Sequence, residues 1–198
     1  MTKRQKRGCG LVLLGMILIL LSLFLHITQE RQDQIAGENA STLLQQLELS
    51  RISLELPEEN EALEPTLPTV MAEKEYLGYS MIGTLRVPSV SIELPVLSQW
   101  SYELLNVAPC RYFGSIPEGN MILMGHNYKS HFTPLHDVEE GAAVEFEDVN
   151  GIVYHYTVAK IETLHKNDGE LLPSEYPLTL FTCTRGGQNR VVIRCQIN

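Results

Sequence analysis

The stretch PLTLFTCTRGGQNRVVIRCQIN (177–198) has the clearest strand pattern of this chain. Two apolar runs, 177–184 and 189–198, flank a polar loop that contains two adjacent glycines. Short runs rich in Val, Ile, Thr and Phe with such a loop between them are typical of β-strands that fold onto each other. The stretch therefore predicts a strand pair, with Cys183 near the end of the first strand and Arg190 at the start of the second.

Five similar runs precede this pair, beginning after Tyr76, and each predicts a strand. They are MIGTLRVP (81–88), SIELPVL (91–97), NMILMGHN (120–127), AAVEFEDV (142–149) and GIVYHYTVAKIETL (151–164). The dipeptide Asn150-Gly151 predicts a hairpin turn between the last two. The one clear helix in this region is SYELLNV (101–107), with Ser101 as its N-cap. Because no long helical run separates the later strands, we expect a mainly β fold, a closed or nearly closed barrel, rather than a parallel βαβ sheet.

Residues 8–27 form an apolar segment without Asp, Glu, Lys or Arg. About 20 such residues are what a helix needs to cross the hydrocarbon core of a bilayer. A basic tip, residues 1–7, precedes the segment, and acidic residues follow from Glu30 onward. The positive-inside rule then predicts a single-pass signal anchor in the cell membrane, with the N-terminus cytoplasmic and the rest extracellular. A cleaved signal peptide is the alternative, but the run is longer than a usual signal sequence and bulky residues follow it.

Residues 28–75 are acidic and rich in Gln and Asn, and we expect them to form an extracellular tether. Such a composition buries too little apolar surface to make a core, which favours a solvated spacer. Leu43, Leu44 and Leu47 have helical spacing, so one or two amphipathic turns that dock on the following domain are the alternative. Residues 76–198 are expected to form the single globular domain.

The net charge of −9 argues against a nucleic-acid-binding protein, which needs a basic face. Four cysteines are present, and Cys9 is expected at the cytoplasmic membrane edge, which leaves an odd number outside. At least one external thiol is therefore unpaired or pairs with another molecule. No CxxC motif or metal-like Cys/His spacing occurs, so neither a metal nor another cofactor is expected.

The strand pattern distinguishes the three external cysteines. Cys195 alternates with apolar residues of the last strand, so it is expected to face the core. Cys110 follows Pro109 and leads into the segment RYFG (111–114), with no obvious chemistry nearby. Cys183 terminates an apolar strand and opens a glycine loop, a position where a reactive side chain is both fixed and exposed. Cys183 is therefore the candidate nucleophile.

A nucleophilic cysteine needs a basic or positively charged neighbour, because the thiol is mostly protonated at its ordinary pKa. His126 follows an apolar strand and Gly125, and could serve as the general acid for a leaving amine. Arg190 begins the last strand, and its permanent charge suits the stabilisation of an oxyanion. Nucleophile, acid and oxyanion donor together are what acyl transfer requires.

Other residues compete for these roles but are interpreted as structural. We expect surface or strand positions for His131, His136, His155 and His165. Asp137 and Asp168 are expected to be solvated loop carboxylates, and Trp100 and Tyr102 are expected to have packing roles. Arg185 and Arg194 lie at less suitable positions than Arg190.

The motifs TLFTC (179–183), NRVVIR (189–194) and GHN (125–127) together resemble the sortases of Gram-positive bacteria. The resemblance covers about residues 80–197 and the N-terminal anchor. It implies an eight-stranded β-barrel, catalytic roles for Cys183, His126 and Arg190, and a place for Thr182 in the substrate groove. The short segment 165–176 departs from class B sortases, which have a long helical insertion there, whereas the loop after Cys183 is similar to that of class C and D types.

The resemblance further implies cleavage of an LPxTG-like sorting signal between Thr and Gly through a thioacyl-enzyme. The expected partners are proteins with that signal and an amine acceptor on a cell-wall precursor or pilin. There are two alternatives. The chain could be another cysteine acyltransferase or peptidase of the envelope, or a non-catalytic anchored β-domain.

Overall fold

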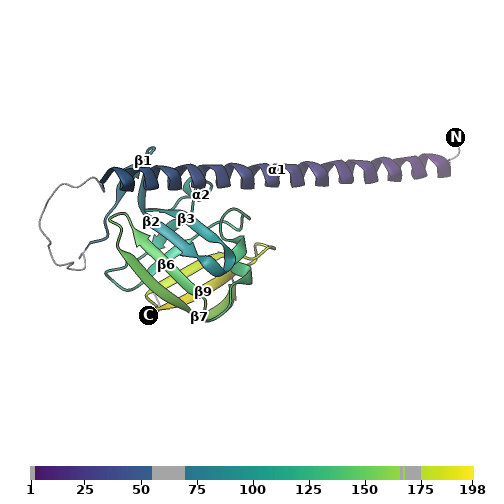
Figure 1. Cartoon of the computed structure of the whole chain (residues 1–198). Helices are drawn as coiled ribbons and strands as arrows, with labels where there is room; N and C mark the ends of the chain where they lie inside the picture. The colour runs from purple at the N-terminus through teal and green to yellow at the C-terminus, as the bar shows by residue number, and fades with distance from the viewer. Residues whose placement is uncertain (1–2, 55–69, 166, 168–174) are drawn as a thin grey trace, which may run out of the picture.

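The structure is a computed structural model that describes residues 3–54, 70–165, 167 and 175–198, with side chains of the first helix described over 12–50. The elements in chain order are α1 (Lys3–Leu54), β1 (Lys74–Tyr76), β2 (Tyr79–Val87), η1 (Pro88–Val90), β3 (Ile92–Leu97), α2 (Tyr102–Leu105), β4 (Cys110–Phe113), β5 (Met121–Met124), η2 (Thr133–Asp137), β6 (Ala143–Asp148), β7 (Val153–His165), β8 (Leu178–Cys183) and β9 (Asn189–Ile197). These elements form a β-barrel, and the long helix α1 lies along one side of it (Figure 1). The predicted mainly β fold is confirmed.

The barrel closes because β2 pairs with β3 on one edge and with β6 on the other. The strand order around it is β2-β3-β4-β5-β8-β9-β7-β6, and the short strand β1 adds to β2 outside the ring. Closure removes the exposed sheet edges that would otherwise attract other chains. The expected eight-stranded barrel is therefore confirmed, with β1 as an additional strand.

Two of the pairings are parallel and determine where the candidate site lies. Strand β5 runs parallel to β8, with Met124 opposite Phe181, so the carboxyl ends of both strands meet at the same end of the barrel. Strand β3 runs parallel to β4 at Leu97 and Cys110. The residues that follow β5 and β8 are thus neighbours in space although they are far apart in the sequence.

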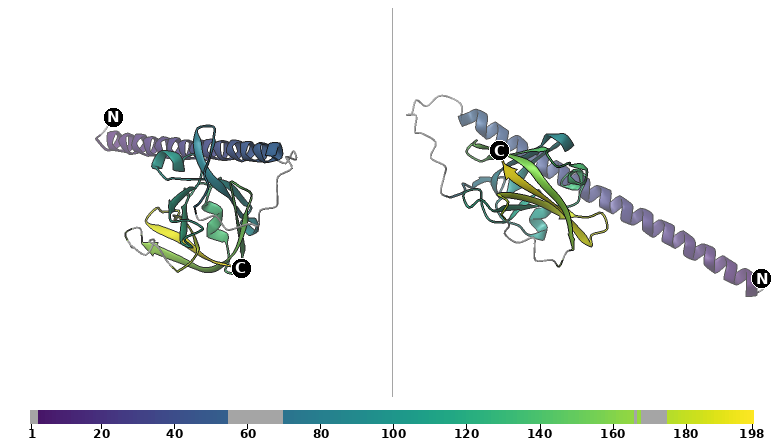
Figure 2. Two further views of the ribbon diagram at one scale, coloured as in Figure 1. Left: turned by 90° about the vertical axis from the view of Figure 1, so that its left-hand side faces the viewer. Right: turned by 90° about the horizontal axis from the view of Figure 1, so that it is seen from below.

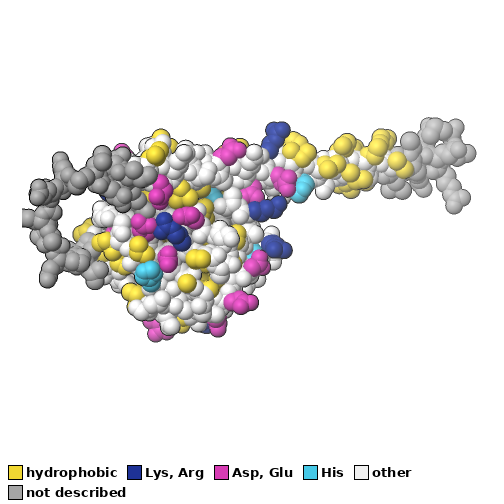
Figure 3. Space-filling model, in the orientation of Figure 1, with side chains coloured by type: hydrophobic (Ala, Val, Ile, Leu, Met, Phe, Trp, Pro, Cys, Tyr) yellow, Lys and Arg dark blue, Asp and Glu magenta, His cyan; other side chains and the backbone are white. Residues whose placement is uncertain are grey.

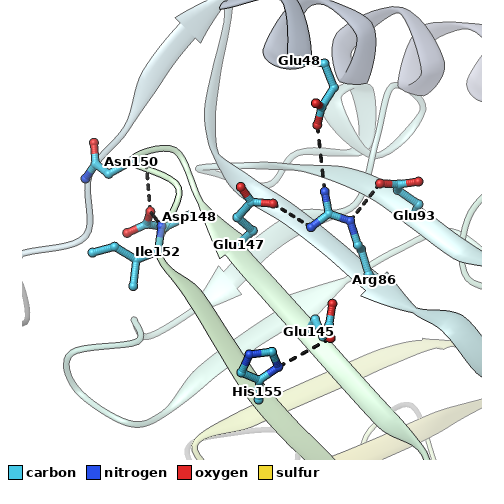
Figure 4. Close-up of polar contacts among 9 residues, drawn as sticks. All are labelled: Glu48, Arg86, Glu93, Glu145, Glu147, Asp148, Asn150, Ile152 and His155. Carbon is cyan, nitrogen blue, oxygen red and sulfur yellow. Dashed lines mark hydrogen bonds and ion pairs between the residues drawn. The ribbon is translucent and has the colours of Figure 1, made fainter. Parts of the chain in front are cut away.

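The hairpin between β6 and β7 forms where Asn150-Gly151 predicted it. Gly151 has φ +85°, a left-handed conformation that favours glycine. The Asp148 carboxylate accepts hydrogen bonds from the backbone N–H groups of Asn150 at 2.8 Å and Ile152 at 2.9 Å (Figure 4). On the inward face, Val144 and Phe146 of this hairpin are buried in the core of the barrel.

Helix α2 is a single turn at the predicted position. The Ser101 hydroxyl accepts a hydrogen bond from the backbone N–H of Leu104 at 3.1 Å, so Ser101 is the N-cap that the sequence indicated. Leu105 is buried, which fixes the turn against the barrel.

Helix α1 is unbroken through residues that were expected to form a solvated spacer. Ala36, Ala40, Leu43 and Leu47 lie on one face of the helix, and all four are buried against the barrel. Both views of Figure 2 show α1 along the side of the barrel. The physical reason is an apolar stripe two turns longer than the leucines alone indicate, because the small side chains of Ala36 and Ala40 continue it. The boundaries of a tether at 28–75 remain a prediction.

The N-terminal half of α1 extends past the barrel and exposes apolar side chains (Figure 3). A single helix of the described chain is long and apolar enough to cross a membrane, with a mean hydropathy of 2.2 in its most apolar window. These features indicate membrane anchoring. The side chains of the basic tip and Cys9 lie outside the described residues, and the side of the membrane that each end occupies remains a prediction.

Candidate active site

Burial separates the three described cysteines, all of which are free thiols. Cys110 and Cys195 are fully buried, and burial raises the pKa of each of these thiols to about 12. A thiol with so high a pKa is neither ionised at neutral pH nor reachable by a substrate. Cys183 is partly exposed at the end of β8. Cys195 faces the core as predicted, and Cys183 is the thiol that a substrate can reach.

The β8–β9 hairpin brings Arg190 beside Cys183. The two residues are directly opposite each other in the strand register. The backbone N–H of Thr184 donates to the Asn189 carbonyl at 2.9 Å, which closes the loop. The Arg190 guanidinium donates to the Asn189 carbonyl at 3.2 Å, so its position is fixed partly by its own hairpin.

His126 reaches the same place from the end of β5. The backbone N–H of Gly125 donates to the Phe181 carbonyl at 3.2 Å, and the hydroxyl of Thr182 donates to the Gly125 carbonyl at 2.9 Å. These bonds hold the residue before His126 against the strand that ends in Cys183. Burial lowers the pKa of His126 from its ordinary value, so the neutral imidazole predominates at neutral pH.

Cys183, His126, Arg190 and Thr182 line one cavity of about 210 Å³. Its apolar side consists largely of aromatic rings. The centroids of Trp100 and Tyr112 are 5.5 Å apart, and those of Tyr112 and Phe181 are 5.3 Å apart. The cavity therefore combines a thiol, an imidazole and a guanidinium with an apolar wall, which suits an extended peptide with an apolar side chain.

Trp100 and Tyr102 differ from the packing roles expected for them. Trp100 is 40% exposed and Tyr102 is 73% exposed, and both line the cavity. The sequence placed them beside a helix, but the groove that they border is formed by strands distant in the sequence. Thr182, in contrast, is buried, and its hydroxyl bonds to Gly125.

Two histidines near His126 also differ from expectation. His131 is only 1% exposed, and its ring nitrogens make no hydrogen bond of good geometry among the described residues, although the backbone of Ala36 and Val107 lies close to them. Burial lowers the pKa of His131 to about 4. His136 Nε2 lies 3.2 Å from the carbonyl oxygen of Cys183, a contact that the sequence did not indicate. The surface position expected for His131 is therefore wrong.

The remaining competitors lie elsewhere. Arg194 is buried and bonds to Glu162 at 2.9 Å and Thr179 at 3.3 Å, whereas Arg185 lines a separate cavity beside α1. His155 is exposed and pairs with Glu145 at 3.5 Å (Figure 4). Asp137 and His165 are exposed, and Asp168 lies outside the described residues.

The family model of the sortase domain matches residues 85–198. The chain belongs to the sortase family. It is therefore a cysteine transpeptidase enzyme. A search of curated protein sequences finds no significant match.

Solved structures agree in fold with this sortase. Sortase C1 of Streptococcus agalactiae in complex with MTSET is 23% identical with a TM-score of 0.54, over 60% of this chain and 69% of that chain. Sortase C1 of Streptococcus suis is 23% identical with a TM-score of 0.52, over 60% of this chain and 73% of that chain. Listeria monocytogenes sortase A is 22% identical with a TM-score of 0.54, over 60% of this chain and 87% of that chain.

Proposed function

We propose that this sortase cleaves an LPxTG-like sorting signal between Thr and Gly and transfers the new carboxyl end to an amine. The observation that supports this proposal is that Cys183, His126 and Arg190 line one cavity with an aromatic wall. The wall suits the apolar side chain of a sorting signal. The acceptor class, a cell-wall precursor or a pilin lysine, is part of the proposal.

In this mechanism the Cys183 thiolate attacks the carbonyl carbon of the Thr–Gly bond. Negative charge develops on the carbonyl oxygen, and the Arg190 guanidinium stabilises it by charge-assisted hydrogen bonds. Protonated His126 donates its proton to the glycine amine as the C–N bond breaks. A thioester between Cys183 and threonine remains.

The acceptor amine then attacks the thioester. Neutral His126 takes a proton from the amine, an amide bond forms, and the Cys183 thiolate leaves. Because burial lowers the pKa of His126, only a minor fraction of the free enzyme carries the proton that the first step needs at neutral pH. The barrel faces the cell exterior in this proposal, where sorting signals and acceptors occur.

The test uses the 198-residue chain in detergent micelles with a fluorogenic LPxTG peptide and hydroxylamine as the acceptor. We expect a hydroxamate product and a thioacyl adduct at Cys183 by mass spectrometry. Cys183→Ala should abolish both, and His126→Ala and Arg190→Ala should each lower kcat/KM by roughly 100-fold or more. Arg185→Ala is the matched control, because it removes a neighbouring guanidinium outside this cavity.

Full activity in Cys183→Ala would reject the proposed nucleophile. Hydrolysis without any hydroxamate would favour a cysteine peptidase, and binding without cleavage would favour a non-catalytic domain.

A further inference from the structure

The loop after His126, residues 127–132, is folded compactly on itself. The backbone N–H of Phe132 donates to the His126 carbonyl at 3.1 Å, and the backbone N–H of His131 donates to the Tyr128 carbonyl at 3.0 Å. The Phe132 ring is fully buried and lies directly beneath Gly125. Any displacement of this loop therefore reaches His126 through the backbone.

Tyr128 in this loop contacts the imidazole directly. The rings of His126 and Tyr128 stack with centroids 4.7 Å apart and planes at 28°. The Tyr128 hydroxyl donates to Asn106 Oδ1 at 3.1 Å, so the far end of the ring is bound to the segment after α2. The ring limits how far the imidazole can turn.

Helix α1 binds the loop at Ser130. Asp33 Oδ1 accepts a hydrogen bond from the Ser130 backbone N–H at 2.9 Å and lies 2.6 Å from the Ser130 hydroxyl. Gly37, one turn further along α1, permits the close approach, because a Cβ there would lie 3.0 Å from Ser130 Cβ. A hydrogen bond to an ionised carboxylate is stronger than one between neutral groups.

Apolar packing does not hold this part of the helix. A cavity of about 310 Å³ lies between α1 and the loop, and polar or charged residues line much of it, including Glu30, Asn127, Lys129 and Arg185. The buried stripe of α1 begins at Ala36, one turn beyond Asp33. Two polar contacts therefore link the helix to the loop here: the Asp33–Ser130 hydrogen bonds and an ion pair between Lys129 and Glu30 at 3.5 Å. The ion pair is exposed and contributes little, so Asp33 and Ser130 form the stronger link.

We infer that α1 is a positioning element for the catalytic histidine: Asp33 holds Ser130, the loop holds the Tyr128 ring, and the ring holds His126. The inference rests on the proposed role of His126. It also links the site to the membrane, since the exposed apolar part of α1 reaches Ile27 and the six residues from there to Asp33 rise about 9 Å in a helix. Catalytic geometry then depends on the juxtamembrane helix, and removal of α1 impairs turnover even where the barrel remains folded.

The experiment compares Asp33→Ala and Ser130→Ala with Glu48→Ala in the full chain in detergent micelles. Glu48 is the matched control, because it contacts Arg86 at 3.9 Å from the same helix but at the other end of the docked segment (Figure 4). We expect Asp33→Ala to lower kcat about 10- to 100-fold, since small misplacements of a catalytic group cost that much. KM for the sorting-signal peptide should change little, because the aromatic wall is untouched. Asp33→Asn keeps an acceptor oxygen and should restore most of kcat.

An independent readout is the NMR titration of His126 in a Cys183→Ala background. Loss of the Tyr128 ring contact exposes the imidazole, so its pKa should rise toward the ordinary value in Asp33→Ala and stay unchanged in Glu48→Ala. Tyr128→Leu should reproduce the shift and keeps the test decisive if Asp33→Ala fails to fold.

An unchanged kcat and an unchanged titration in a folded Asp33→Ala chain would overturn the inference, and so would equal losses in Glu48→Ala. If the wild-type chain forms no hydroxamate, the proposed function fails, but the titration still decides whether Asp33 positions His126.

Discussion

The buried hydroxyl of Thr182 joins β8, which ends in Cys183, to the segment between β5 and His126. It donates a hydrogen bond to the Gly125 carbonyl at 2.9 Å. Thr182 directly precedes Cys183, and Gly125 directly precedes His126. Thr182→Val keeps the shape but leaves that carbonyl without this donor, which costs about 1–3 kcal/mol in a buried site. We expect a corresponding loss in the free energy of unfolding and a lower kcat, measured by denaturant titration and peptide cleavage.

Thr182→Ser retains the hydroxyl and is the control, with a smaller loss from the missing methyl group. If Thr182→Val matches Thr182→Ser in both kcat and stability, the hydrogen bond does not hold the site.

The position of a residue along its strand made some of these side chains predictable from the sequence. Cys183 and Arg190 could be paired because they flank one short loop, and Cys195 could be assigned to the core by strand alternation. The burial of His131 could not be predicted in the same way. Its surroundings include α1, and a contact between segments so distant in the sequence leaves no local pattern.

The turn from β5 into the loop at 127–132 depends on a glycine. A Cβ at Gly125 would lie 2.6 Å from the Phe132 ring, closer than real Cβ atoms approach other atoms. The Phe132 ring is fully buried, so the backbone must shift instead. We expect Gly125→Ala to destabilise the fold by about 1–3 kcal/mol, as overpacking does, and to lower kcat because the shift displaces His126.

Gly186→Ala in the β8–β9 loop is the control, because nothing lies within 4 Å of a Cβ there. Thermal unfolding and peptide cleavage by both variants give the comparison. A Gly125→Ala chain as stable and active as Gly186→Ala would show that the ring yields easily. Gly125→Ala combined with Phe132→Leu should recover part of the lost stability.

Elements with a local signal could be predicted, including the apolar part of α1, but the extent of its docked part could not, because Leu43, Leu44 and Leu47 indicated only one or two turns. Alternation and the Asn150-Gly151 turn indicated the strands, and Ser101 indicated the start of α2. The docked part of α1 has an acidic, Gln-rich composition that is typical of a spacer. The helix nevertheless docks through a narrow apolar stripe in which Ala36 and Ala40 are as fully buried as Leu43 and Leu47. Small residues are needed there as well as large ones, because the helix packs closely against the barrel.

At the scale of the whole molecule, α1 and the barrel form one assembly, with polar contacts near both ends of the docked part of the helix. Asp33 binds Ser130 near the candidate site, and Glu48 contacts Arg86, which also bonds to Glu147 at 2.6 Å (Figure 4). The buried stripe from Ala36 to Leu47 lies between them. The membrane-anchoring helix is thus part of the folded domain, and the stability of the barrel should depend on it.

His131 lies near this interface and makes the stability of the assembly depend on pH. Burial lowers its pKa in the folded state to about 4, with His126 adding to the decrease and Asp33 opposing it, whereas an unfolded histidine titrates near 6.5. Between these values the unfolded chain binds a proton that the folded chain does not, so the free energy of unfolding rises with pH. His131 should therefore contribute its full stabilisation above about pH 6.5 and lose roughly 3 kcal/mol as the pH falls to about 4. Thermal unfolding of the full chain in micelles across this range measures the loss.

Two variants isolate the contribution of His131 from that of the other titrating groups. His131→Phe keeps a buried ring without a proton-binding nitrogen, so its melting temperature should fall less steeply between pH 6.5 and 4 than that of the wild-type chain. His155→Phe removes an exposed histidine that pairs with Glu145 and should leave the steepness close to that of the wild type, because an exposed ion pair contributes little. Equal slopes in the wild-type and His131→Phe chains would contradict this prediction, because they would mean that the pKa of His131 is the same in the folded and unfolded chains. In that case, water must reach the imidazole in the folded chain, and burial would not hold its pKa near 4.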